Sequence, residues 1–173
     1  MKPASQGSGW FQQNRQRNSP PGVQHNRLWL IPAFLAAPVA WLVLHLVFGV
    51  PVASRAGAEW FGFTEAGFRN LFLLAVIVYP ILEEIVFRGA LQGWLLEKAE
   101  LRRSFAGIST ANVITSLVFA AMHLFNQSLF WAALIVLPSL VFGWAREASS
   151  GVVVPILLHM FYNAGFYLLF VAT

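Results

Sequence analysis

The chain has 173 residues, of which 58% are hydrophobic and only 10% are charged. A mean hydropathy of +0.65 lies outside the usual range of soluble globular domains and indicates an integral membrane protein. The formal net charge of +4 comes from basic residues scattered between apolar stretches, so nucleic acid is not an expected partner, and the absence of cysteine excludes disulfides and thiolate chemistry.

The chain opens with a polar segment, residues 1–26, that is rich in Gln, Asn, Ser, Pro and Arg and has no apolar period. This composition is typical of disorder, and we expect a disordered cytoplasmic tail. Nothing further along the chain marks a second domain. Residues 27–173 are therefore expected to form a single membrane domain.

Three long stretches carry no Asp, Glu, Lys or Arg: Leu28–Ser54, Ser104–Ala145 and Ala148–Thr173. A transmembrane helix needs about 20 mostly apolar residues. The first and last stretches each have room for one span, and the middle stretch has room for two, separated by a turn at Asn126–Ser128. A fifth span is expected around residues 70–96.

The fifth span must include charged residues. Its uncharged run, Asn70–Leu82, would make a helix of about 20 Å, too short for a hydrocarbon core about 30 Å thick. The helix must therefore continue through Glu83, Glu84 and Arg88, which we expect to be buried in protein. The segment before it, residues 53–70, mixes aromatic residues, glycines and charges and is expected to lie at the interface.

With five spans and a cytoplasmic N-terminus, eight Lys and Arg residues lie inside and only Arg55 and Arg69 lie outside. This asymmetry is the one that the positive-inside rule expects. The predicted fold is an all-α, polytopic membrane bundle of about five transmembrane helices. We expect it in the plasma membrane with its N-terminus in the cytoplasm and its C-terminus outside.

The stretch "YPILEEIVFRG" places two acids and a base on one predicted helix. Glu84 and Arg88 are four residues apart with the acid first, which favours an ion pair on one face. Glu83 is rotated by about 100° from Glu84 and can point elsewhere. Pro80 removes a backbone donor and disrupts the bond to Val76, so a kink or widening that admits water is expected there.

Two further helices carry polar residues at helical spacing. His123 ends "FAAMH", and His159 and Asn163 lie four apart in "HMFYN". If these helices pack beside Glu83, one pocket contains a carboxylate, two imidazoles and an amide. Glu83 could then act as a general base, with His123 orienting the water, while His159 and Asn163 donate hydrogen bonds to the oxyanion of a tetrahedral intermediate. The chemistry would be peptide-bond hydrolysis.

Two alternatives use the same residues. Glu83, His123 and His159 are also possible zinc ligands that leave one position open for water, although the metalloprotease motif H-E-x-x-H is absent. A non-catalytic scaffold, immunity factor or proton-relay protein could also bury such groups. His45 and Asn112 are interpreted as packing residues, Asn112 at a close helix contact.

The stretches "EEIVFRG", "FAAMH" and "HMFYN" together resemble the E-E-x-x-x-R, F-x-x-x-H and H-x-x-x-N motifs of the CPBP family of intramembrane proteases. That family includes CAAX-processing endoproteases and bacteriocin-processing or immunity-type relatives. The resemblance covers roughly residues 79–166, about half of the chain. Larger members resemble bundles of about eight helices, so a shortened core of five would accept a narrower or differently oriented substrate.

The resemblance implies a role for each matching residue. Glu83, His123, His159 and Asn163 correspond to the catalytic set, and Glu84 and Arg88 correspond to structural positions. The implied substrate is a membrane-anchored or lipidated protein or peptide, such as a prenylated C-terminal motif, a leader peptide or a sorting tail. The family has been described both as glutamate-type and as metal-dependent, so no cofactor is assigned and zinc stays open.

Overall fold

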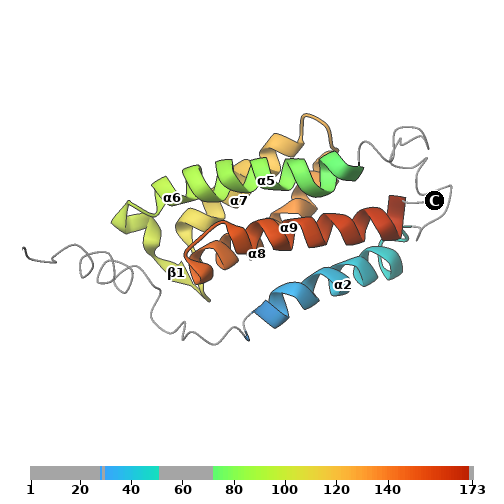
Figure 1. Cartoon of the computed structure of the whole chain (residues 1–173), viewed down its shortest axis with the longest axis horizontal. Coiled ribbons are helices and arrows are strands. Elements are labelled where there is room, and N and C mark those ends of the chain that lie inside the picture. The colour runs from blue at the N-terminus through green and yellow to red at the C-terminus, as the bar shows by residue number, and fades with distance from the viewer. Residues whose placement is uncertain (1–27, 29, 51–71, 172–173) are drawn as a thin grey trace, which may run out of the picture.

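The computed structural model describes residues 28, 30–50 and 72–171. The tail and the interfacial segment expected at 1–26 and 53–70 lie outside these residues. The described chain forms rods of helix that run side by side along the long axis of the molecule (Figure 1). In chain order these are α2 (Leu30–Leu46); a continuous rod of residues 72–95 that includes π-helical Leu74–Val78, α5 (Tyr79–Glu84), π-helical Ile85–Leu91 and α6 (Gln92–Leu95); α7 (Thr110–His123); α8 (Leu129–Ser149); and α9 (Val153–Phe166) with its π-helical extension Tyr167–Val171.

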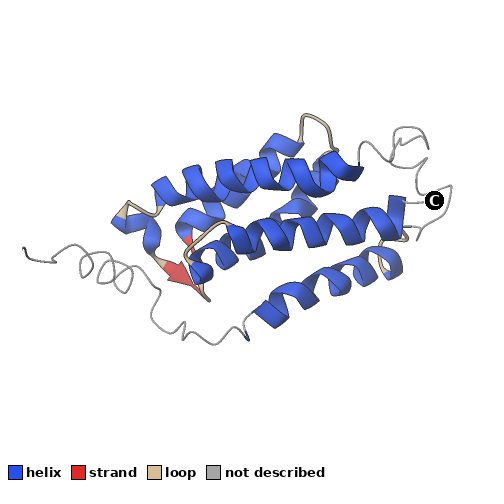
Figure 2. Cartoon of the chain, in the orientation of Figure 1, coloured by secondary structure: helices blue, strands red, loops and turns tan. Residues whose placement is uncertain are grey.

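The predicted all-α membrane bundle is confirmed. The only sheet within the described residues is a two-stranded hairpin, β1 (Ser104–Phe105) with β2 (Ile108–Ser109), at the same end of the bundle as α6 (Figure 2). By length and composition, Leu129–Ser149 and Val153–Phe170 could each cross a membrane, while α2 and α7 are apolar but shorter. The rod of residues 72–95 continues through both glutamates, as expected because the uncharged run before them is too short to cross a membrane.

The third helix is shorter than expected. An uncharged stretch from Ser104 to the turn before α8 suggested about 20 helical residues, but α7 begins only at Thr110. The preceding residues turn back instead, because Ala106 and Gly107 adopt left-handed backbone angles, with φ of 51° and 81°. The Ser109 side chain then accepts a hydrogen bond from the Asn112 N–H and caps the new helix.

The turn predicted between the third and fourth helices is present. Helix α7 ends at His123 and α8 begins at Leu129. The Ser128 side chain accepts a hydrogen bond from the Trp131 N–H and so caps α8. At the far end of α8, Ser150 takes a left-handed conformation with φ of 54°, which stops the helix and lets α9 return beside it.

The bundle exposes apolar side chains and buries polar ones together with an apolar core. Exposed large hydrophobic residues lie along every rod, among them Leu35, Leu82, Leu117, Leu137 and Leu157. The buried polar side chains are Glu84, Arg88, Gln92, Ser109, Asn112, Thr115, Ser116, Ser139 and His159. A soluble protein cannot expose so much apolar surface, whereas lipid tails favour it, and polar side chains then bond between helices.

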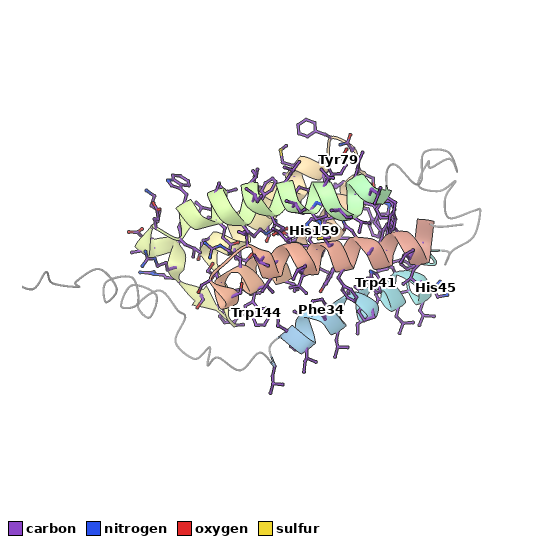
Figure 3. The ribbon with its side chains drawn as sticks, in the orientation of Figure 1. Phe34, Trp41, His45, Tyr79, Trp144 and His159 are labelled. Atoms are coloured by element: carbon purple, nitrogen blue, oxygen red, sulfur yellow. The ribbon has the colours of Figure 1, made fainter. Side chains whose placement is uncertain are left out.

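Helix α2 packs against α8 and α9 through apolar residues. An apolar cluster of Ala33, Ala37, Phe142, Ala145, Leu158 and Tyr162 joins α2, α8 and α9. The Tyr162 hydroxyl donates to the Ala33 carbonyl at 2.8 Å. Figure 3 shows Phe34 and Trp41 of α2 beside α9, and His159 of α9 near the middle of the bundle.

Candidate active site

The rod of residues 72–95 presents its polar residues on two faces. Glu84, Arg88 and Gln92 follow one another at intervals of four and are completely buried. The side chain of Glu83 points away from them and remains 31% exposed. Adjacent residues of a helix point in directions about 100° apart, so one glutamate is enclosed and the other is accessible.

Arg88 occupies a site built from three helices. Its Nε lies 3.2 Å from Glu84 Oε2, although the two atoms are not aligned for a hydrogen bond, so the contact is one between charges. Its Nη2 donates to the carbonyl and the hydroxyl of Ser139 at 3.0 and 2.8 Å. The guanidinium also lies over the rings of Phe119 and Phe142, at 4.6 and 5.7 Å from their centroids.

His159 lies between the two glutamates. Its Nδ1 is 2.9 Å from Glu84 Oε1, and its Nε2 is 3.7 Å from Glu83 Oε2. The imidazole stacks on Phe142 at 4.8 Å between centroids, which fixes the plane of the ring. Sequence reasoning assigned Glu84 to Arg88 alone, and only the packing of α9 against α5 shows that the same carboxylate also holds His159.

His123 reaches the same region from the end of α7. Its Nδ1 is 2.8 Å from the Phe119 carbonyl one turn earlier, so Nε2 is the nitrogen that can face water or substrate. The Phe119 ring contacts both imidazoles, at 4.7 Å from His123 and 5.9 Å from His159 between centroids. One phenyl ring therefore contacts both histidines.

Asn163 contacts a widened turn of the glutamate-bearing rod. The Tyr79 N–H donates to the Leu74 carbonyl, five residues back, which is the π register. The Asn163 amide donates through Nδ2 to the neighbouring Ala75 carbonyl at 2.8 Å. The widening expected before Pro80 is present, but the carbonyl whose bond is replaced is Ala75 rather than Val76, because the turn is π-helical.

A second set of polar contacts continues from Arg88 toward the hairpin. The Gln92 amide donates to the Gly143 carbonyl at 3.0 Å and to Glu147 Oε1 at 2.7 Å. The same carboxylate oxygen accepts from the Ser109 hydroxyl at 2.6 Å. Sequence analysis did not single out Gln92 or Glu147, although each continues a four-residue spacing, Glu84–Arg88–Gln92 on one helix and Ser139–Gly143–Glu147 on the other.

Asn112 and His45, interpreted from the sequence as packing residues, each lie within hydrogen-bond distance of a backbone carbonyl. The Asn112 amide donates to the Leu140 carbonyl at 2.9 Å, and Gly143 approaches it so closely that a Cβ there would overlap the amide. This is the close helix contact that the small residues around Asn112 indicate. His45 lies at the end of α2, where its Nδ1 is 3.0 Å from the Val50 carbonyl.

The arrangement can bind and polarise water or a carbonyl group. The accessible carboxylate of Glu83 lies beside His159, the Phe119 ring contacts both imidazoles, and Asn163 follows one turn after His159 on α9. Within the described residues, no three His, Asp or Glu side chains are grouped to hold a metal ion. The zinc set considered from the sequence, Glu83, His123 and His159, is therefore not assembled as a ligand group here.

The model of a family described as type II CAAX prenyl endopeptidase Rce1-like matches residues 65–165, more than half of the chain. The matched region contains both glutamates, both candidate histidines and Asn163. No curated protein and no solved structure matches the chain.

Proposed function

The chain belongs to the Rce1-like family of type II CAAX prenyl endopeptidases, which are integral membrane proteases, and on that premise we propose that Glu83 is its general base. The proposal is supported by exposure, because the Glu83 side chain is partly exposed whereas Glu84 is fully buried. A carboxylate in a water-poor site that retains some access is suited to taking a proton from water. Glu84 cannot serve in this way, because it is buried between Arg88 and His159.

In the first step Glu83, helped by His123, takes a proton from a bound water as the oxygen attacks the peptide carbonyl carbon. The carbonyl oxygen becomes an oxyanion, to which His159 and Asn163 donate hydrogen bonds. The protonated Glu83 then gives its proton to the departing amine as the C–N bond breaks. The products are one new carboxyl end and one new amine end.

The contact between His159 and Glu84 determines how His159 can act. When Nδ1–H donates to Glu84, Nε2 carries a proton only in the imidazolium form. In that form His159 is a charged donor for an oxyanion, and charge-assisted bonds are the stronger kind. With both glutamates ionised and Arg88 and His159 charged, the cluster has no net charge, which reduces the cost of burying it.

The proposed substrate is a prenylated or otherwise lipid-anchored protein whose C-terminal segment enters the bundle. The basic residues Lys98, Arg102, Arg103 and Arg146 belong to the end of the bundle that carries α6 and the hairpin. We assign this end to the cytoplasm by the positive-inside rule, which orients the N-terminus inward and the C-terminus outward in a plasma membrane. A lipid anchor would then reach the site within the leaflet.

The single observation that supports this function best is the position of His159 between an accessible and an enclosed glutamate. A non-catalytic scaffold has no need to leave one of two adjacent glutamates accessible beside an oriented imidazole. No step is assigned to a metal, since the described residues form no ligand group.

The test is cleavage of a prenylated CAAX peptide by purified protein in lipid vesicles, with and without a strong zinc chelator. Glu83→Gln should abolish cleavage without altering the folded yield. The matched control is Glu100→Gln, an exposed carboxylate near the end assigned to the cytoplasm, which should keep full activity. Cleavage by Glu83→Gln would refute the base assignment, and chelator-sensitive cleavage would refute a metal-free mechanism.

A further inference from the structure

Pro80 changes the hydrogen bonding of the helix that carries the glutamates. Just before it the backbone is in the π register, with the Tyr79 N–H donating to the Leu74 carbonyl. If that register continued, the Ala75 carbonyl would accept from the backbone nitrogen of residue 80. Proline has no N–H, so the Ala75 carbonyl loses its backbone donor.

The donor that replaces it comes from α9. Asn163 Nδ2 donates to the Ala75 carbonyl at 2.8 Å, across 88 positions of sequence. Because a carbonyl oxygen accepts and cannot donate, the contact requires the NH₂ end of the amide to face the π turn. The amide is therefore held against rotation about its terminal torsion, and its second N–H has a defined direction.

We propose that Pro80 is a positioning residue for Asn163: by withholding a backbone donor, it makes the Ala75 carbonyl an anchor that orients the Asn163 amide. The inference rests on the proposed function, in which the second Asn163 N–H donates to the oxyanion. An amide without this anchor could rotate and present its oxygen, which would repel an oxyanion. The proline therefore acts on the reaction without contacting the substrate.

Pro80→Ala restores a backbone N–H while removing little volume. In the π register the new N–H bonds to the Ala75 carbonyl, and in an α register the Tyr79 N–H does so instead. Either way a backbone donor competes with Asn163 for this carbonyl. If Pro80 had only a structural role, Pro80→Ala should stabilise the protein and leave kcat unharmed. A proline inside a helix is destabilising, and alanine is the best helix former.

The experiment measures kcat, KM and the thermal midpoint, Tm, of the full chain in lipid vesicles, with a prenylated CAAX peptide as substrate. Pro80→Ala should lower kcat by roughly 10- to 100-fold, the range expected when a catalytic group is misplaced. KM should stay near the wild-type value, because the oxyanion forms only in the transition state, and Tm should equal or exceed that of wild type. The matched control is Pro38→Ala, an exposed proline inside α2, which should leave kcat unchanged.

The double variant Pro80→Ala/Asn163→Ala tests whether the proline acts through the amide. It should have the kcat of Asn163→Ala alone, since no amide remains to be misdirected. A Pro80→Ala protein with wild-type kcat, or a further loss in the double variant equal to that of the single change, would overturn the proposal.

A readout independent of activity separates this proposal from the proposed function. If wild type cleaves nothing, the proposed function fails, and the Tm values of the two single variants and the double variant still test the anchor. Non-additive Tm shifts would support the link between Pro80 and Asn163, and additive shifts would overturn it.

Discussion

Replacing Arg88 with methionine should destabilise the protein severely, because it takes from the buried Glu84 carboxylate one of its two cationic partners and leaves only His159. The two charged atoms are 3.2 Å apart and both side chains are fully buried. At an effective dielectric constant near 20, that separation corresponds to about 5 kcal/mol of attraction. Part of it is offset by desolvation, so we expect a loss of about 3–5 kcal/mol, the usual cost of removing one partner of a buried pair.

The double variant Glu84→Gln/Arg88→Met should lose less than the sum of its two single changes, because it leaves no unpaired charge and a glutamine oxygen can still accept from His159 Nδ1. The assay is equilibrium unfolding in mixed micelles, with folded yield as a second readout. The matched control is Arg103→Met, an exposed arginine whose loss should change stability by no more than about 0.5 kcal/mol. A loss below about 1 kcal/mol for Arg88→Met, the level of a surface pair, would refute the reasoning.

Two further changes test the oxyanion donor and the close helix contact. Asn163→Ala should lower kcat by about 10²–10³-fold with little change in KM, because an oxyanion donor is lost; wild-type kcat in steady-state cleavage assays would remove Asn163 from the site. Gly143→Ala would drive a methyl group into the Asn112 amide and should cost about 1–3 kcal/mol in equilibrium unfolding. Gly151→Ala, where a Cβ meets only a backbone oxygen at 3.9 Å, is its control, and equal stability of the two variants would contradict the close contact.

Hydrogen bonds in the polar interior attach α8 to the rod that carries the glutamates. Ser139 and Gly143 accept from Arg88 and Gln92 through their carbonyl groups, so α8 is attached to the glutamate-bearing rod at two successive turns. Between helices in lipid there is little hydrophobic driving force, and such bonds together with close packing specify how the helices are arranged. The contacts around Arg88 therefore maintain the alignment of the helices that carry Glu83 and His159.

Much of the fold could be predicted from the sequence. Long uncharged stretches set the number of helices, and the short run before Glu83 required the helix to continue through charged residues. The spacing of Glu84 and Arg88 indicated their pairing, and the adjacency of Glu83 indicated its separate direction. These inferences succeed because helical geometry alone relates residues that are one to four positions apart.

Other features depended on contacts between distant segments. The hairpin that shortens α7 arises from left-handed backbone at Ala106 and Gly107, which an uncharged, apolar stretch does not indicate. The pairing of Gln92 with Glu147 required the register of two helices against each other. Periodicity within one helix carries no information about that register.

The sequence by itself determined that the chain is a membrane helix bundle with one glutamate pair, three histidines and two asparagines within its spans, because composition and local spacing set hydropathy and helical faces. Only the tertiary structure decided that His159 lies between both glutamates and that Asn163 bonds to the turn before Pro80. The reason is physical: a buried polar group must find a partner, and which partner it finds depends on how helices far apart in the chain pack together.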